Sequence, residues 1–161
     1  MAVSALILGG NMDGWVTFDL AVVKNAMPID MDTLHQTWVV ENPGKAARLE
    51  ELTVEIREWL RGVCKARKGT LMDPDPLTIP INGFQHAMNL VVFNLGMEMG
   101  VQFAPAVFNL WTSANVWLRM VASGTVNPVP ADDVESGAGG TPWYVSGRER
   151  KAGGGILNPE A

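Results

Sequence analysis

The sequence predicts an all-α fold, a small bundle of about four helices with extended arms at both termini. Apolar residues recur at steps of three and four over residues 82–124 and again over residues 49–63, which is the spacing of one helix face. The 17 glycines and 10 prolines gather mostly outside these stretches. We therefore expect an N-terminal arm over residues 1–16, a helical core over residues 17–124 and a Gly/Pro-rich C-terminal arm over residues 125–161.

The first elements of the predicted core are a short helix and another short capped segment. Thr17 is expected to cap a helix that ends before Pro28, and Asp30 or Asp32 is expected to cap the next segment. Their apolar side chains are Phe18, Leu20, Ala21, Val22 and Val23 in the helix and Leu34, Trp38 and Val39 in the segment after it.

The next element is a long amphipathic helix. Asn42 and Pro43 combine an N-cap residue with a proline at the first helical position. Its apolar stripe consists of Leu49, Leu52, Ile56, Trp59, Leu60 and Val63, and its opposite face carries Glu50, Glu51, Arg57, Glu58 and Arg61. The helix ends in Lys65, Arg67 and Lys68, cations that the helix dipole favours there and that form either a solvated end or a basic contact patch.

A helical hairpin completes the predicted core. Residues 73–82 carry three prolines and should cross between helices as extended chain. Asn82, with Gln85 three positions on, predicts the next helix start. Gly100 predicts its end, Pro105 the start of the last helix, and Gly124 the end of that helix. The hairpin buries Phe84, Ala87, Met88, Val91, Val92 and Leu95, then Val107, Leu110, Trp111, Ala114, Trp117, Leu118 and Val121.

Length, charge and cysteine content narrow the function classes. A chain of 161 residues is expected to form one domain. The net charge of −5 argues against an open nucleic-acid-binding face, which needs excess basic charge. A single cysteine, Cys64, excludes an intrachain disulfide and fits a reducing compartment. We expect no signal peptide and no membrane-spanning segment.

Residues that carry chemistry are few and unpaired in the sequence. His35, His86 and Cys64 lack the spacing of a zinc site, and no partnered nucleophile accompanies either histidine. The glycine runs lack the ending of a phosphate-binding loop. Asp73 and Asp75 fit turn chemistry better than a calcium loop. We therefore predict no catalytic residues, no cofactor and no metal, and a protein that is not an enzyme.

Aromatic residues give the candidate interface instead. Trp111 and Trp117 lie six positions apart and point in different directions, so either one faces a neighbouring subunit or a broad buried face includes both. The pair Trp143 and Tyr144 stands in an arm with little else apolar and is a candidate intermolecular anchor. The predicted interface residues are Trp117, Trp143, Tyr144, Arg148, Arg150 and Lys151.

Four segments carry a family resemblance: EELTVEIREWLRGV at 50–63, DPLTIPINGFQHAMNLVVFNLG at 75–96, VWLRMVASGTV at 116–126 and WYVSGRER at 143–150. With a glycine-rich tail behind a proline-bounded crossover and two last helices, the chain resembles the head–tail connector (adaptor) proteins of tailed bacteriophages, particularly the Mu-like group. The resemblance carries over no catalytic residues.

The resemblance implies a structural virion protein, assembled in the cytoplasm of the bacterial host. Such proteins form a homo-oligomeric ring, expected to be a dodecamer, beneath the portal protein. The ring continues the DNA channel, lets DNA pass without sequence-specific binding, and offers a docking surface to the tail or stopper protein. Another phage structural subunit, of the capsid or the tail tube, is the alternative, and a small cytoplasmic enzyme or regulator is a further one.

Overall fold

The computed structural model describes residues 12–129, and within them the chain forms five α-helices, two 3-10 turns and one small sheet. The all-α prediction is confirmed, with a two-stranded sheet that it did not include. The elements in chain order are β1 (Trp15–Thr17), α2 (Leu20–Ala26), α3 (Ile29–Glu41), η1 (Pro43–Lys45), α4 (Arg48–Ala66), β2 (Thr78–Pro80), η2 (Ile81–Gly83), α5 (Phe84–Glu98) and α6 (Pro105–Ala122).

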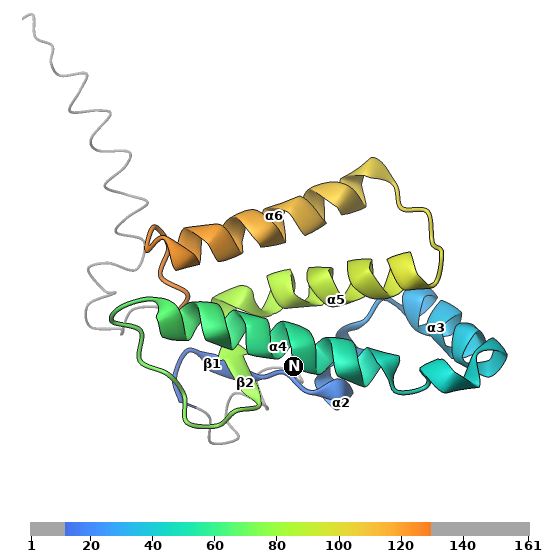
Figure 1. The fold of residues 1–161 in the computed structure, drawn as a ribbon, viewed down its shortest axis with the longest axis horizontal. Coiled ribbons are helices and arrows are strands. Elements are labelled where there is room, and N and C mark those ends of the chain that lie inside the picture. The colour runs from blue at the N-terminus through green and yellow to red at the C-terminus, as the bar shows by residue number, and fades with distance from the viewer. Residues whose placement is uncertain (1–11, 130–161) are drawn as a thin grey trace, which may run out of the picture. The chain divides into compact units, whose positions relative to one another are not determined.

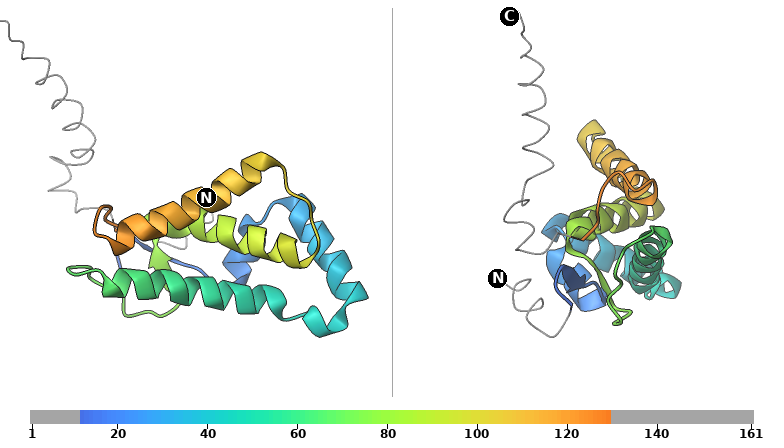
Figure 2. Two further views of the ribbon diagram at one scale, coloured as in Figure 1. Left: turned by 45° about the horizontal axis from the view of Figure 1, so that its top comes forward. Right: turned by 90° about the vertical axis from the view of Figure 1, so that its left-hand side faces the viewer.

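Helix α5 lies between α4 and α6 and runs opposite to both (Figure 1). Its buried residues, which include Leu90, Phe93 and Gly96, point in all directions around its axis. A helix that is apolar all round has to be covered on every side, and this explains why α5 is the central helix. Helix α3 lies at the end of this layer where α4 begins and α5 ends (Figures 1 and 2).

The sheet joins the start of the core to the crossover before α5. Strands β1 and β2 are antiparallel, with Trp15 opposite Pro80 and Val16 opposite Ile79. The prediction of an extended crossover over residues 73–82 is confirmed for β2, whereas residues 76 and 77 form a turn and residues 81 and 82 belong to η2. Trp15 and Val16 are completely buried, so the final residues of the predicted arm 1–16 belong to the core.

Three predicted helix starts are wrong. Thr17 closes β1, and α2 is capped by Asp19, whose carboxylate accepts a hydrogen bond from the backbone N–H of Val22 at 2.9 Å. Asn42 precedes the 3-10 turn η1, and Asn82 lies within the 3-10 turn η2, so neither residue caps an α-helix. The chain enters α4 and α5 from these turns in helical conformation, with no side-chain cap.

The start of α3 also differs from the expectation. Pro28 stands at the N-cap position, and Asp30 and Asp32 lie in the first turn. Acidic side chains in a first turn are favoured by the helix dipole without bonding to a backbone N–H. The sequence therefore indicated the correct region for this helix but the wrong capping residue.

The predicted ends of the hairpin helices are confirmed. Gly100 and Gly124 have φ angles of +78° and +82°, the left-handed conformation that glycine adopts without strain. At the end of α5 the N–H of Val101 donates to the carbonyl of Gly96 at 2.8 Å, which closes a Schellman motif. Pro105 is the first residue of α6, as expected.

Two residues assigned to buried stripes are exposed. Trp59 lies on the outer side of α4, and Leu110 on α6 is 50% exposed. The axes of α5 and α6 diverge toward the connection between them (Figure 2), so the first half of α6 is only partly covered. Val126 and Val129, which belong to the predicted C-terminal arm, pack against the core.

Candidate functional site

The two histidines lie in separate, poorly solvated environments. On α5, the imidazole of His86 stacks on the indole of Trp117, with ring centroids 5.0 Å apart and an interplanar angle of 23°. Burial lowers the pKa of His86, so the ring is neutral at neutral pH. A neutral ring stacked in the interior is a packing residue, and no nucleophile or carboxylate is hydrogen-bonded to it in the described part of the chain.

His35 lies on α3 beside a depression of about 460 Å³ whose polar lining includes Lys24, Asp32 and Gln36. Burial, followed by the nearby charge of Lys24, lowers the pKa of His35, and Asp32 opposes these effects. The Nε2 atom of His35 is inaccessible to solvent, so it cannot meet a ligand in the depression. Within residues 12–129, no three His, Cys, Asp or Glu side chains lie close enough together to hold a metal ion.

Cys64 is completely buried at the end of α4. Burial raises the pKa of its thiol to about 11. The thiolate is the nucleophilic form of cysteine, and very little of it is present at neutral pH when the pKa is so high. Cys64 therefore acts as a small apolar core residue.

Asp73 and Asp75 organise the crossover rather than a cation site. The Asp73 carboxylate accepts hydrogen bonds from the backbone N–H groups of Met12 (3.1 Å) and Asp75 (2.9 Å). The Asp75 carboxylate accepts one from Leu77 at 2.9 Å. The bonds from Asp75 and Leu77 are the turn-forming bonds expected of aspartate and precede strand β2. The bond from Met12 instead ties the crossover to the residues before β1.

Two arginines predicted on the exposed face of α4 point inward instead. Arg57 is buried and donates to the carbonyl of Phe18 at 3.0 Å. Arg61 donates to the carbonyls of Thr78 (2.7 Å) and Asp73 (2.8 Å), and its guanidinium lies 5.4 Å from the ring centre of Trp15. They join α4 to carbonyls that neither the helices nor the short sheet satisfy. Their i, i+4 spacing is their only sequence signal.

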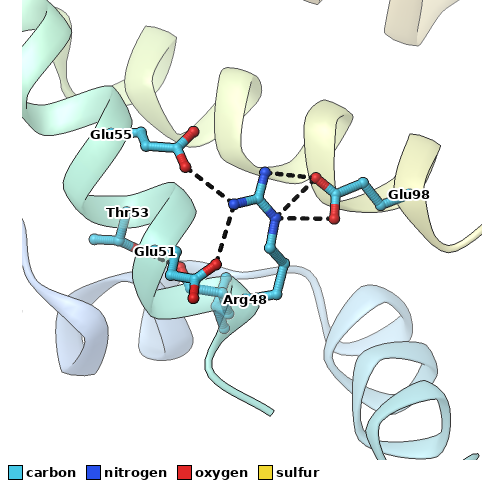
Figure 3. Close-up of polar contacts among 6 residues, drawn as sticks. Arg48, Glu51, Thr53, Glu55 and Glu98 are labelled. Carbon is cyan, nitrogen blue, oxygen red and sulfur yellow. Dashed lines mark hydrogen bonds and ion pairs between the residues drawn. The ribbon is translucent and has the colours of Figure 1, made fainter. Parts of the chain in front are cut away.

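A network of charged side chains links α4 to α5 (Figure 3). Arg48 donates to the Glu98 carboxylate at 2.7 and 2.9 Å and also to Glu51 (3.2 Å) and Glu55 (3.0 Å). The guanidinium of Arg48 lowers the pKa of Glu98. This network joins the beginning of α4 to the end of α5.

The outer surface of α6 carries almost no charge. From Met99 to Val129 the only charged side chain is Arg119, and no carboxylate among the described residues forms an ion pair with it. Most side chains on the outward-facing side of α6 are exposed: Phe108, Asn109, Thr112, Ser113, Val116 and Arg119. Water-facing helices normally carry charged residues on this side, so this side of α6 is unusual among the described surfaces.

An aromatic cluster lies under the first half of α6. The ring of Phe93 on α5 is stacked with Phe103 and Trp111 and meets Phe108 edge-on, with centroids 5.1 to 5.3 Å apart. Phe93 is buried, whereas Phe108 is 45% exposed. Large aromatic side chains open to solvent beside uncharged residues are typical of interaction surfaces.

The predicted interface residues have different outcomes. Trp117 is 7% exposed and packs in the core, where its ring lies against Gly83 and His86. Trp111 is the half-buried member of the pair, on the side of α6 that carries the aromatic cluster. The other five predicted residues, Trp143, Tyr144, Arg148, Arg150 and Lys151, lie outside the described residues.

Two further findings bear on the predictions. At the end of α4, Lys65 and Lys68 are exposed and Arg67 is half-buried, which agrees with a basic contact patch and with a solvated helix end alike. None of the helices within the described residues combines the length and hydropathy needed to cross a bilayer.

Comparison with models of known protein families, with curated proteins and with solved structures finds no match.

Proposed function

We propose that this chain is a structural subunit that assembles with copies of itself, as the head–tail connector ring of a tailed bacteriophage. The observation that carries the proposal is the exposed, almost uncharged outer surface of α6. Burial keeps His86 and the thiol of Cys64 in their uncharged forms at neutral pH, so neither group is activated as a nucleophile in a way that would favour an enzyme.

The composition of the α6 surface supports assembly. The centres of protein interfaces are depleted in charged residues and enriched in aromatic residues and methionine. Helix α6 has one charge and exposes Phe108 and Leu110, and Met97 is exposed at the end of α5. Covering these side chains removes apolar area from water at a gain of roughly 25 cal/mol per Å².

The C-terminal segment supplies further contacts in this proposal. Trp143 and Tyr144 bury large areas for few rotatable bonds, and Arg148, Arg150 and Lys151 provide basic groups for acidic surfaces. We propose that these five residues contact neighbouring subunits. Trp117 is not part of this proposed interface, because its indole is already buried in its own chain.

The ring would lie beneath the portal protein, offer a surface to the tail or stopper protein, and let DNA pass through its lumen in the virion. The net charge of −5 supports passage without binding, since acidic side chains repel phosphates. Glu50 is exposed on α4 and makes no ion pair among the described residues, so it is available for such a lining, whereas Glu55 and Glu58 already pair with Arg48 and Arg57. A basic lumen in the assembled ring would contradict this part of the proposal.

A subunit of the capsid or tail tube would present an uncharged contact surface as well. Electron microscopy of the purified full-length protein separates the possibilities, because the connector proposal predicts closed rings, whereas the alternatives predict lattices or stacked tubes. A chain that stays monomeric at all concentrations would contradict self-assembly. An enzyme or regulator would instead lose function, with its assembly intact, on replacing His35 with Gln.

A further inference from the structure

A second uncharged helix surface lies on α3, away from α6. Ile29, Thr33, Gln36 and Val40 follow one another at helical spacing and form the α3 stripe, and all four are exposed. Ile29 and Val40 are 78% and 79% exposed. Because two large aliphatic side chains are exposed on one stripe of this helix, the stripe has no packing partner among residues 12–129.

The α6 stripe is formed by Phe108, Thr112, Val116 and Arg119, which follow at steps of four, four and three along the outer side of the helix. It resembles the α3 stripe in its lack of acidic groups and in combining apolar residues with threonine. Both stripes are long enough for two helices to pack along about three turns.

The charges that flank the two stripes are opposite. The charged residues of α3 are all acidic, namely Asp30, Asp32 and Glu41, and the only charge of α6 is the basic Arg119. No ion pair within the described residues involves Arg119, Asp30 or Glu41. Complementary charges at the edge of an uncharged contact set its register and exclude other pairings.

We infer that the α3 stripe of one copy packs against the α6 stripe of the next copy. The inference rests on the proposed self-assembly and names the two surfaces that meet. Because α3 and α6 lie at different borders of the helical layer (Figures 1 and 2), each subunit offers one stripe to each of two neighbours. Such a head-to-tail contact generates a ring when the rotation closes.

The charge pattern favours this partner over a second α6. Two α6 stripes facing each other would each contribute one arginine and no acid, so the only charges in the contact would repel. Pairing α6 with α3 instead places Arg119 near carboxylates. A second copy of this chain therefore supplies, through α3, an uncharged surface to cover the α6 stripe and the acidic groups to pair with Arg119.

The test uses two full-length variants and their mixture. One variant carries Ile29→Glu and Val40→Glu on the α3 stripe, and the other carries Thr112→Glu and Val116→Glu on the α6 stripe. All four positions are exposed, so the fold should be retained, while a carboxylate buried in the contact is strongly disfavoured. Each variant alone should have the mass of the monomer, 17.4 kDa, by light scattering.

The mixture should form a dimer of one copy of each variant and nothing larger, because one intact α3 stripe then meets one intact α6 stripe. Formation of that dimer also shows that both variants are folded. If the α3 variant assembles like the wild type, α6 packs against something else and the inference is wrong, although self-assembly stands. A mixture that stays monomeric overturns the inference too, whereas a monomeric wild type contradicts the proposed function itself.

Discussion

Helices α4 and α6 flank the same central helix and run in the same direction (Figure 1), yet their outer sides differ in charge. The exposed side of α4 carries Glu50, Glu55, Glu58 and Lys65, whereas α6 exposes only Arg119 as a charged group. Both helices bury an apolar face against α5. Folding therefore explains their inner sides, whereas the lack of charge on the outer side of α6 has no role in folding and is what the proposed contact with a neighbouring subunit would use.

The arginines of the two helices sharpen this difference. Arg61→Met should lower the free energy of unfolding by about 3 kcal/mol, because it removes charged hydrogen bonds to two carbonyls of the crossover. Arg119→Met on α6 is the matched control and should change it by less than about 0.5 kcal/mol. Urea denaturation at low protein concentration measures both.

Equal losses of unfolding free energy in the two arginine variants would contradict this difference between the helices. They would mean that Arg119 stabilises the fold of its own chain and is not left free to contact a neighbour.

Two glycines test how closely the connection between α5 and α6 packs on α5. A β-carbon at position 96 would overlap the ring of Phe103, whereas one at position 62 on the outer side of α4 would meet nothing within 4 Å. Gly96→Ala should therefore cost about 2 kcal/mol through overpacking. Gly62→Ala should instead stabilise the helix by about 0.5–1 kcal/mol.

Thermal denaturation of the two glycine variants gives the sign of each effect. A stabilising Gly96→Ala would show that Phe103 in the connection before α6 does not pack on α5 as described.

The charged network at the start of α4 predicts a dependence on pH. Arg48 lowers the pKa of Glu98 in the folded state. The stabilisation of the fold by the Glu98 carboxylate is therefore complete at a pH above the pKa of Glu98 in the unfolded chain, and it is lost as the pH falls through the pKa of Glu98 in the folded chain. Glu98→Gln should cost about 1 kcal/mol at pH 7, since the network is partly exposed.

The measurement is the difference in unfolding free energy between wild type and Glu98→Gln as a function of pH. The lowered pKa values of His35 and His86 are common to both proteins, so their contributions cancel in this difference. A difference that persists unchanged at pH 2 would contradict the assignment of this stabilisation to the charged form of Glu98.

Local signals in the sequence predicted the helix ends well. Gly100, Pro105 and Gly124 act through their own backbone preferences, which neighbouring elements do not override. Asn42 and Asn82 also gave capping signals, but the 3-10 turns at these places depend on how the chain enters each helix. That geometry is set by packing far away in the sequence.

Side-chain roles were harder to predict than helices. Arg57 and Arg61 read as surface charges because the carbonyls that they satisfy belong to residues 18, 73 and 78, which only the fold brings near. The lack of charge between residues 99 and 129 was visible in the sequence. Only the structure shows that half of α6 is exposed, which turns an apolar helix into a candidate interface.

The proposed contact between α6 and a neighbouring subunit is tested most directly by placing negative charges on the outer side of α6 and, as a control, on the outer side of α4. Light scattering of the full-length wild type, of the Thr112→Glu and Val116→Glu double variant, and of Val54→Glu on the exposed side of α4 measures assembly. We predict an oligomer for wild type and Val54→Glu and a monomer for the α6 variant, with unchanged circular dichroism. An α6 variant with the mass of the wild-type oligomer would contradict the claim that this surface is covered by a neighbour.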